Sequence, residues 1–499
     1  MKNLNLIFLT LFPIFILSSC GQLTPDEDAN VFYIDTQEDF DKWSNHQFPA
    51  GSKVLFAEGE TFKGQFILQG AGTVDSPNIA SAYNKETKEP QTDWIDNKPK
   101  INGEGKVISA LLLKCGSNWE INNIEVTNTN GTKEQQGKLL GINAIAEDVG
   151  TVENITIKNC FVHRVNGDVG GKQTGGIHVL VLGDSIKTKF HNLTIENNTI
   201  ANTGGVGISN QSSWGGINTD EYHPWTNFVI RKNRVEHTGR NGIIIRYALN
   251  PLVEYNVLAY NSRFDTGHSV FNFNTTGCIV QYNEAYGNTS DNPDDIDHGG
   301  FDADYQSKGT VIQYNYSHDN NWFCGIMRKG YNSDITIRYN VSQNELLGGF
   351  LYGFPSLKGV EDVKIYNNTL YFGKGKGKRV FVNAGKKDRI PIETSFWNNI
   401  FYFEDEATWG FEPDETCVLE NNLYFNVSPK GANPFTGNPL FVNPGTGGTD
   451  IDMTDPNRLA GYKLKEGSPA LFTGKKIEDN GGKDFAGGAV SATPNIGAF

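Results

Sequence analysis

Short runs of alternating apolar and polar residues recur along this chain, and each run ends in an asparagine. Val311-Ile-Gln-Tyr-Asn315 and Ile335-Thr-Ile-Arg-Tyr-Asn340 show the phrase. Its closing residues follow one another at intervals of 23 to 35 positions, at Asn198, Asn233, Asn256, Asn283, Asn315, Asn340, Asn368, Asn399 and Asn422. Alternation with a period of two predicts β-strands with one buried face.

The length of this repeat decides between repeat architectures. No helical pattern separates the strands, so we exclude βαβ units. The leucine spacing of leucine-rich repeats is missing, and a propeller blade needs four strands in ~40–45 residues. Two or three strands per repeat instead predict a solenoid of stacked coils. We therefore expect an all-β, single-domain parallel β-helix over residues 31–425 and a C-terminal closing segment over 426–499.

The repeated asparagine fits the tight turns of such a solenoid. Its short amide side chain tolerates left-handed backbone. Copies that stack at one position of successive coils can also hydrogen-bond to one another. We therefore expect a ladder of asparagine side chains along the solenoid.

Both ends of the repeat region resemble a known family. Gly51-Ser-Lys-Val-Leu-Phe56 and Pro99-Lys-Ile-Asn-Gly103 look like the first coils of secreted right-handed parallel β-helix carbohydrate-active proteins, and Pro494-Asn-Ile-Gly-Ala-Phe499 looks like their closing segment. Characterised members of that family include polysaccharide lyases, glycoside hydrolases and epimerases. The resemblance implies a right-handed β-helix that acts on a glycan. It does not select the reaction, because fold does not imply function.

The first residues predict export and lipid anchoring. Met1-Lys2-Asn3 is followed by a mainly apolar run and then Leu17-Ser-Ser-Cys20. This is the pattern of a secretory signal, and the run is shorter than the ~20 residues of a membrane helix. Leu17-Ser-Ser-Cys20 resembles the lipobox of bacterial lipoproteins, in which the cysteine is acylated. We expect a signal peptide over 1–19, lipidation of Cys20, a tether over 20–30, and attachment to the outer membrane through the lipid alone.

Composition narrows the range of partners. The net charge is −14 and aromatic residues make up 12% of the chain. Such an acidic chain has no electrostatic reason to bind nucleic acid, and it would bind an acidic glycan through a local basic patch. We expect a monomer. The cysteines beyond Cys20 show no metal-ligand spacing, and we expect them to be buried, with disulfide pairing left open: Cys115, Cys160, Cys278, Cys324 and Cys417.

Alignment of the repeats on their asparagines predicts one shared outer face. In the segment that ends with Asp302-Ala-Asp304, strand alternation places both aspartates outward and places Phe301 and Ala303 inward. Equivalent positions of stacked coils lie ~4.8 Å apart. The outward neighbours that we expect from the same count are His178, Arg246, Asn272 or Asn274, Lys329 and Tyr352.

Two insertions flank this face. Residues 211–225 carry Trp214 and His223, and residues 291–298 carry Asp297 and His298. Loops on a rigid scaffold commonly carry function, and an indole can stack on a sugar ring. The residues that we expect to bind substrate are Trp214, His223, Asn272 and Asn274.

The aspartates allow two kinds of chemistry. Alternate residues lie ~6.5–7 Å apart along a strand. That spacing suits Ca²⁺ held by Asp302 and Asp304, with Asp297 as a third oxygen ligand. It equally suits the two carboxylates of an inverting glycosidase. Spacing alone does not decide between them.

Basic residues beside the aspartates favour elimination on a uronate. An arginine, Arg246 or Arg328, offsets the uronate carboxylate through a bidentate pair. A base then abstracts the proton α to that carboxylate. The candidates for acid and base are Lys329, Tyr352, His178, His298 and Asp304.

Our main hypothesis is a carbon–oxygen lyase acting by β-elimination on an acidic polysaccharide or oligosaccharide, either cleaving the chain or removing water from a terminal uronate. The alternative is a glycoside hydrolase with paired aspartates. A non-catalytic surface glycan-binding protein and an epimerase complete the set. Asp304 and Lys329 are 25 residues apart, like Asn315 and Asn340, so we expect them to be vertical neighbours in the site.

Overall fold

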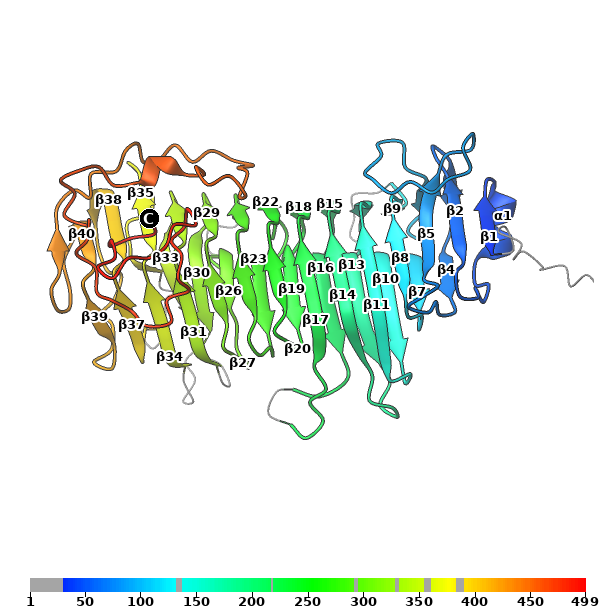
Figure 1. The fold of residues 1–499 in the computed structure, drawn as a ribbon, viewed down its shortest axis with the longest axis horizontal. Helices are drawn as coiled ribbons and strands as arrows, with labels where there is room; N and C mark the ends of the chain where they lie inside the picture. The colour runs from blue at the N-terminus through cyan, green and yellow to red at the C-terminus, as the bar shows by residue number, and fades with distance from the viewer. Residues whose placement is uncertain are drawn as a thin grey trace, which may run out of the picture.

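The computed structural model describes residues 30–131, 137–216, 219–290, 295–327, 332–353, 360–382 and 390–499. These residues form a right-handed parallel β-helix, as predicted (Figure 1). Each coil contributes strands to three sheets, and the strands of successive coils pair in parallel.

The three sheets are named A, B and C. Within the described residues, sheet A consists of 16 strands. They are β1 (Val31–Ile34), β2 (Lys53–Ala57), β5 (Asn78–Tyr83), β8 (Trp119–Asn122), β11 (Thr151–Lys158), β14 (Lys189–Glu196), β17 (Trp225–Arg231), β20 (Ala248–Leu249), β21 (Leu252–Glu254), β24 (Ile279–Gln281), β27 (Ser307–Lys308), β28 (Val311–Gln313), β31 (Asn332–Arg338), β34 (Val360–Tyr366), β37 (Thr394–Trp397) and β39 (Val418–Glu420).

Sheets B and C complete the tube. In the described part of the chain, sheet B consists of 11 strands: β4 (Phe66–Gln69), β7 (Ser109–Lys114), β10 (Leu140–Glu147), β13 (Gly175–Leu182), β16 (Val206–Ser212), β19 (Ile243–Arg246), β23 (Gly267–Phe273), β26 (His298–Ala303), β30 (Trp322–Met327), β33 (Gly348–Gly353) and β36 (Phe381–Val382). Over the same ranges, sheet C consists of 14 strands: β3 (Thr61–Lys63), β6 (Lys100–Asn102), β9 (Glu125–Asn128), β12 (Phe161–Val165), β15 (Thr199–Thr203), β18 (Arg234–Thr238), β22 (Val257–Ala259), β25 (Glu284–Tyr286), β29 (Tyr316–His318), β32 (Val341–Gln343), β35 (Thr369–Phe372), β38 (Ile400–Ala407), β40 (Leu423–Val427) and β41 (Phe435–Thr436).

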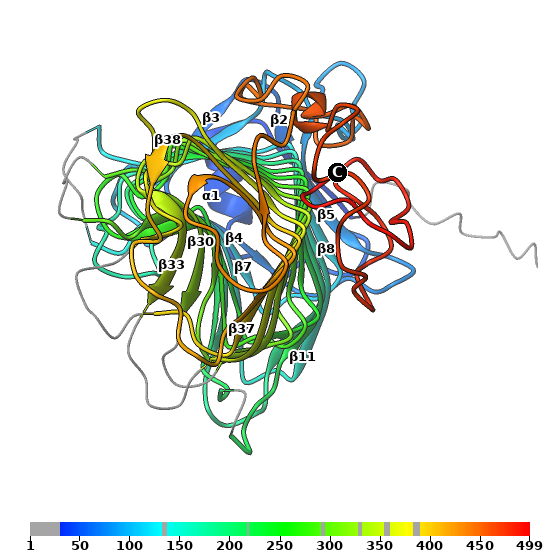
Figure 2. The same cartoon turned by 90° about the vertical axis from the view of Figure 1, so that its left-hand side faces the viewer.

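The sheets are the walls of a tube around a closed interior. In the end view, β5, β8 and β11 lie on one wall and β4, β7, β30 and β33 on another (Figure 2). The inward side chains of all three walls form one continuous apolar core. At its N-terminal end, helix α1 (Gln37–Trp43) inserts Phe40, whose ring stacks on Phe62 at 5.4 Å. The helix thereby covers apolar side chains that have no further coil to pack against.

The predicted asparagine ladder is present in the turn between sheets A and C. The backbone N–H and the side-chain amide of Asn315 donate to Oδ1 of Asn340 at 2.9 and 3.1 Å. Asn283 makes the same pair of bonds to Asn315. The ladder residues do not themselves have left-handed backbone, which corrects the sequence argument. The residue before each of them does, as at Tyr314 with φ 56°, and the ladder amide satisfies the backbone groups that this turn exposes.

The C-terminal segment runs back along the outside of the helix, where it contains the short 3-10 helix η1 (Ala460–Tyr462). In Figure 1 the orange part of the segment lies along one edge of the coils, and the red part crosses in front of the coils at the C-terminal end of the helix. Asp450 accepts from the guanidinium of Arg234 at 2.7 Å, and the backbone N–H of Ile451 donates to Glu284 at 2.9 Å. The segment therefore covers the outer face of sheet C.

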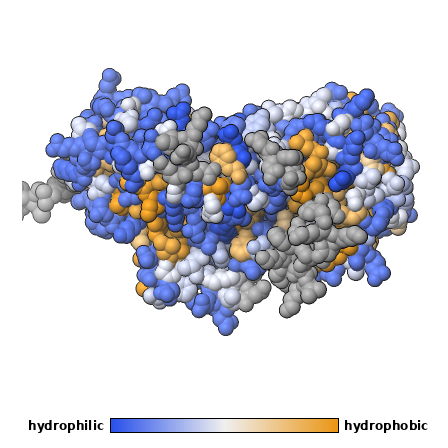
Figure 3. All heavy atoms as spheres, turned by 180° about the vertical axis from the view of Figure 1, so that it is seen from behind, coloured by the Kyte–Doolittle hydropathy of each residue, from blue (hydrophilic) through white to orange (hydrophobic). Residues whose placement is uncertain are grey.

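The cysteines and the surface add little to the sequence picture. Within the described ranges Cys115, Cys160, Cys278 and Cys324 are free thiols; Cys160, Cys278 and Cys324 are buried, whereas Cys115 and Cys417 are half-buried. No helix in those ranges is long and apolar enough to span a membrane. The side of the molecule opposite to Figure 1 is mainly hydrophilic, with hydrophobic patches along its middle (Figure 3).

Candidate active site

The candidate site lies on the outer face of sheet B, in the middle of the helix. Strands β23 and β26 pair with Phe271 opposite Asp302 and Asn272 opposite Ala303. Phe301 and Ala303 belong to the interior core. The prediction that Asp302 lies on the outer face, between two inward residues, is therefore confirmed.

A histidine joins two carboxylates in this site. Nε2 of His268 lies 3.0 Å from Oδ2 of Asp302 and 3.7 Å from Oδ1 of Asp297. The His268 ring packs against the indole of Trp322, with centroids 5.1 Å apart. Burial lowers the pKa of His268, but the charges of Asp302 and Asp297 outweigh it and hold the pKa above its usual value. The two aspartates therefore favour the protonated form of the His268 imidazole.

The neighbouring strand makes room for Asp302. Gly325 of β30 is its partner in the sheet, and a Cβ at Gly325 would lie 2.7 Å from Oδ1 of Asp302. Oδ1 of Asp302 and Nδ1 of His268 are buried, and neither has a hydrogen-bond partner among the residues that the structure describes. Buried polar atoms without partners are rare in folded proteins. The pair therefore indicates a place where a bound molecule can complete the hydrogen bonding.

Beside His268, Asp302 and Asp297 is a depression of about 380 Å³ on the outer face of sheet B. Its polar lining contains one carboxyl group, one guanidinium and one ammonium, and its apolar lining is aromatic. The lining residues are Lys172, Gln173, Gln211, Arg246, Tyr247, Phe271, Phe273, Asp304 and Tyr305. Aromatic surface with a few convergent polar groups is typical of a ligand site.

The charged groups of the depression are perturbed by burial. Burial and the charge of Asp302 raise the pKa of Asp304 to about 8. Burial also lowers the pKa of Arg246 to about 10 and lowers the pKa of Lys172, whose ammonium lies 4.3 Å from the centre of the Phe271 ring. At neutral pH the Asp304 carboxyl therefore carries a proton.

Arg246 lies on the outer face, as predicted, and is held there by hydrogen bonds. Its guanidinium donates to Oε1 of Gln211 at 2.6 Å and to the backbone oxygen of Asn210 at 3.3 Å. The side chain is only 7% exposed. Its charge is therefore directed into the depression that Asp304 also lines.

Two expected outward residues face the interior instead. Tyr352 pairs with Ile326 in sheet B, belongs to the core, and lies 2.9 Å from the Thr394 hydroxyl. Asn272 is fully buried opposite Ala303 and donates to the hydroxyl of Thr275 at 2.7 Å. Both placements were wrong because a count displaced by one residue exchanges the two faces of a strand.

The predicted histidines do not line the depression. His178 is on the outer face but fully buried, 3.2 Å from the Ser209 hydroxyl, and burial lowers its pKa to about 3. His298 is fully buried at the start of β26, with Nε2 2.9 Å from Asp295. His223 is half-buried in the 211–225 insertion. Burial and the nearby lysines, Lys189 first, lower its pKa.

The remaining substrate-binding candidates are also enclosed. Trp214 is 8% exposed and packs into the interior core, so its ring is not an open platform. Asn274 is buried, with left-handed backbone at φ 55°, just after β23. A Cβ at Gly216 would lie 2.9 Å from its amide nitrogen. The 211–225 insertion therefore contacts the end of sheet B, and its first residue, Gln211, lines the depression, whereas Trp214 and His223 do not.

Arg328, Lys329 and Cys20 lie outside the described residues, and their predicted roles stay predictions. The expected alignment of Lys329 with Asp304 rested on a spacing of 25. In sheet B, however, Ala303 is opposite Ile326, a spacing of 23. The count differs because the connection from sheet B to sheet A is longer in the second of these coils: Val311 follows Ala303 by 8 positions, whereas its partner Thr336 follows Ile326 by 10.

The calcium hypothesis depends on the space between the carboxylates. Among the described residues, no group of three His, Cys, Asp or Glu side chains is gathered closely enough to hold a metal ion. His268 occupies the position between Asp297 and Asp302 that a shared cation would need. Asp304 carries a proton and is a poor calcium ligand. Calcium binding stays a prediction.

Sequence reasoning missed three residues of the site: His268, Lys172 and Tyr305. His268 precedes the aligned strand positions, and Lys172 lies on the loop before β13. The sequence does show charged and histidine residues on either side of each aligned strand. It does not show which coil a loop folds over, so it could not place these side chains in the site.

Comparisons with known proteins show that the chain is similar to two lacto-N-biosidases. The chain is similar to a lacto-N-biosidase from Bifidobacterium longum subsp. longum, with 27% identity over 556 aligned positions that cover 90% of this chain and 34% of that protein. The chain thus spans about a third of the length of that relative. It is also similar to the solved structure of a GH136 lacto-N-biosidase from Eubacterium ramulus, with a TM-score of 0.59, 20% identity, and coverage of 73% of this chain and 67% of that one.

A PL6 family alginate lyase aligns with 88% of this chain and 57% of its own, at 14% identity and a TM-score of 0.46. No family model matches the chain. The likeness to the Eubacterium ramulus structure establishes the shared fold.

Proposed function

We propose that the protein is a carbohydrate-active enzyme, a glycoside hydrolase that uses the outer face of sheet B. The observation that carries the proposal is the contrast between Asp302 and Asp304. Asp302 lies 3.0 Å from Nε2 of His268, whereas burial and the Asp302 charge hold a proton on Asp304. Neighbouring carboxyl groups whose environments drive their protonation apart are the arrangement that glycoside hydrolysis requires.

The residues divide the reaction between them. Asp304, protonated at neutral pH, gives its proton to the glycosidic oxygen as the bond to the leaving sugar breaks. The Asp302 carboxylate stabilises the positive charge that develops on the anomeric carbon. A water molecule then adds to that carbon and gives a proton to the Asp304 carboxylate, which restores the acid and completes the hydrolysis. His268 keeps Asp302 in place. Nε2 of His268 also lies 3.7 Å from Oδ1 of Asp297, whose side chain is 42% exposed. A second carboxylate therefore reaches the same space.

The substrate that we propose is a neutral oligosaccharide, with a lacto-N-biose unit as the first candidate. Support comes from the two lacto-N-biosidases to which the chain is similar. The aromatic lining from Phe271, Phe273 and Tyr305 suits the apolar faces of sugar rings. Because the chain spans only part of the curated relative, the substrate has to be tested directly.

One assay decides the reaction class. The purified protein is incubated with oligosaccharides that end in lacto-N-biose, and the products are identified by mass. Cleavage with the gain of one water supports hydrolysis. Asp304→Asn and Asp302→Asn should each lower kcat by ~100-fold or more while the fold is kept. An intact substrate with every glycan of the panel, or full turnover by both variants, would remove the proposal.

A lyase is the second candidate, and Lys172 favours it. Its lowered pKa leaves a larger fraction of Lys172 as the neutral amine, the form that can accept a proton, than in an ordinary lysine, and Arg246 lines the same depression. A uronate carboxylate held by Arg246 would leave its α proton for Lys172 to remove. Unsaturated products absorb in the ultraviolet. A rise in absorbance with uronate glycans, abolished by Lys172→Gln, would select this candidate.

A further inference from the structure

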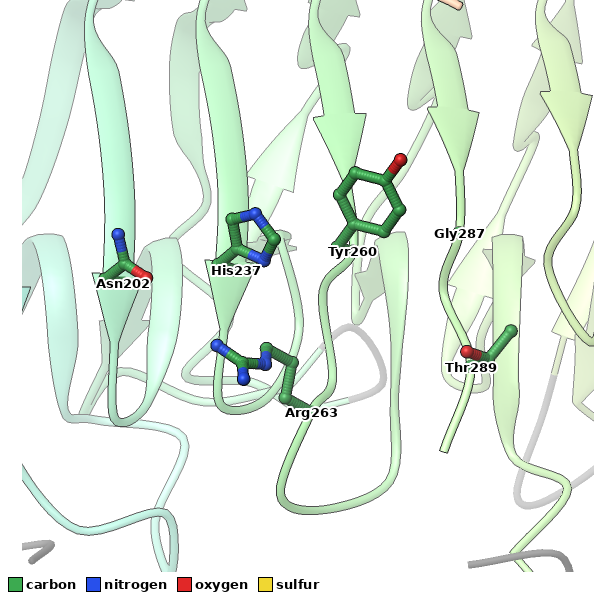
Figure 4. Close-up of a pocket in the computed structure, with 6 residues that line it drawn as sticks. All are labelled: Asn202, His237, Tyr260, Arg263, Gly287 and Thr289. Carbon is green, nitrogen blue, oxygen red and sulfur yellow. The ribbon is translucent and has the colours of Figure 1, made fainter. Parts of the chain in front are cut away.

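A second depression, of about 310 Å³, lies where the strands of sheet C turn toward sheet B. None of its lining residues takes part in the Asp304 depression. They are Asn202, His237, Tyr260, Arg263, Gly287 and Thr289 (Figure 4).

Two aromatic rings form a platform in this depression. His237 and Tyr260 occupy equivalent positions of neighbouring coils, both with left-handed backbone at φ 53°. Their rings are nearly parallel, with centroids 5.1 Å apart and planes at 10°. Figure 4 shows the two rings side by side with their faces toward the viewer. Tyr260 is 45% exposed, which is unusual for an aromatic side chain in this protein.

The next coil has a glycine where a side chain would overlap the Tyr260 ring. Gly287 follows at the equivalent position, and a Cβ there would lie 2.5 Å from Cδ1 of Tyr260. Any other side chain at Gly287 would collide with the ring. The opening beside the platform therefore depends on a glycine, with φ 65°, at this one position.

Arg263 supplies a cation beside the platform. Its neighbours Arg240 and Arg234 are paired with Asp265 at 3.2 Å and with Glu236 at 2.6 Å. Among the described residues, no carboxylate lies within salt-bridge distance of Arg263. Burial lowers the pKa of His237, and the charge of Arg263 lowers it further while Glu236 acts against both. At neutral pH the platform is therefore uncharged and Arg263 provides the hydrogen-bond donors.

One loop connects this depression with the candidate active site. Residues 260–266 begin with Tyr260 and carry Arg263, and both line the second depression. The same loop ends at Thr266, whose hydroxyl donates to the carboxylate of Asp297. The loop therefore connects the second depression to Asp297, which lies beside His268 and Asp302 on the outer face of sheet B.

We propose that the second depression is an accessory sugar-binding subsite, in which a pyranose unit of the glycan stacks on Tyr260 and accepts hydrogen bonds from Arg263. The inference rests on the proposed function. A pyranose has an apolar C–H face that fits an aromatic ring and a rim of hydroxyl groups that fits a guanidinium. A purely apolar ligand would leave Arg263 desolvated without a partner, and a small anion would make no use of the ring.

The test separates binding from turnover. Kd is measured by titration calorimetry for a series of oligosaccharides that end in lacto-N-biose, from disaccharide to hexasaccharide, with Asp304→Asn as the background. Adding Tyr260→Ala should raise the Kd of the hexasaccharide about tenfold, the upper range for an aromatic contact. It should leave the Kd of the disaccharide unchanged. Tyr260→Phe should keep the affinity, and Arg263→Gln should lose part of it.

A matched control is Phe472→Ala, an aromatic residue that is 66% exposed on the C-terminal segment. It should leave every Kd unchanged. An equal Kd for the hexasaccharide with and without Tyr260, or an equal loss for all lengths, would overturn the subsite. So would a protein that binds none of the oligosaccharides. If the protein binds them without cleaving any, the hydrolase proposal fails, while the effect of Tyr260→Ala still decides the subsite.

Discussion

Replacing Asp304 by Asn should make the protein more stable and less active, and the gain in stability should depend on pH. Burial and the Asp302 charge raise the pKa of this carboxyl from 3.8 to about 8. The folded chain therefore binds the Asp304 proton more tightly than the unfolded chain does. The stability that this group contributes is complete below pH ~4 and is lost as the pH rises toward pH ~8.

The size of the effect follows from the same shift. One pKa unit corresponds to about 1.4 kcal/mol, so at pH 7 Asp304 costs the folded state roughly 4 kcal/mol. An asparagine has nearly the same shape and cannot ionise. The variant should match the wild type near pH 4 and exceed it increasingly up to pH 8. Over the same change, kcat should fall by ~100-fold or more, because the proton donor is gone.

Thermal unfolding of both proteins at several pH values measures this difference. The quantity to plot is the Tm of the variant minus the Tm of the wild type, in which all other titrating groups cancel. Asp334→Asn, at an exposed position of sheet A, is the matched control and should give a flat line. A Tm difference for Asp304→Asn that does not change between pH 4 and pH 8 would refute the argument that burial holds a proton on Asp304.

Four further predictions concern the site and the scaffold. His268→Gln removes the imidazole that contacts Asp302, so kcat/KM should fall by ~10-fold or more with a shifted pH profile; an unchanged profile would separate His268 from the reaction. Asn315→Ala deletes the buried hydrogen bonds of the side-chain amide to Val280, Asn340 and Asn283 and should cost roughly 3–5 kcal/mol in urea unfolding; a loss below ~1 kcal/mol would contradict a stabilising role of the ladder. Tyr352→Phe should cost ~1 kcal/mol and leave turnover intact, because Tyr352 lies in the core; inactivity would contradict that placement. Removal of divalent cations with EDTA should leave turnover unchanged, and a loss that Ca²⁺ restores would favour the calcium hypothesis.

The repeat and the fold class were accessible from the sequence because their causes are local. Alternation of side chains reports which strand face is buried, and an asparagine at a constant place in each coil reports a turn that stacks on itself. The outward position of Asp302 followed from the same logic, because it is fixed by alternation within one short strand between Phe301 and Ala303. No information from another coil was needed.

The predictions failed where the count had to cross a turn. Between sheets C and B the chain runs from Thr238 directly to Ile243 in one coil, but from Ala259 to Gly267 in the next. Because a strand exchanges its faces with every residue of displacement, an uncertain turn length leaves the direction of the following strand undetermined. Tyr352 and Asn272 were placed outward for this reason.

The chemistry of the site was decided by the tertiary structure. Lys172 comes from the loop before β13, and His268 is the second residue of β23. Only the coiling of the chain brings them to Asp304 and Asp302. The proton on Asp304 has a cause that no sequence shows, since it depends on the removal of water and on the distance to a second carboxylate. Sequence specifies which groups can ionise, whereas burial and neighbouring charge determine which of them do.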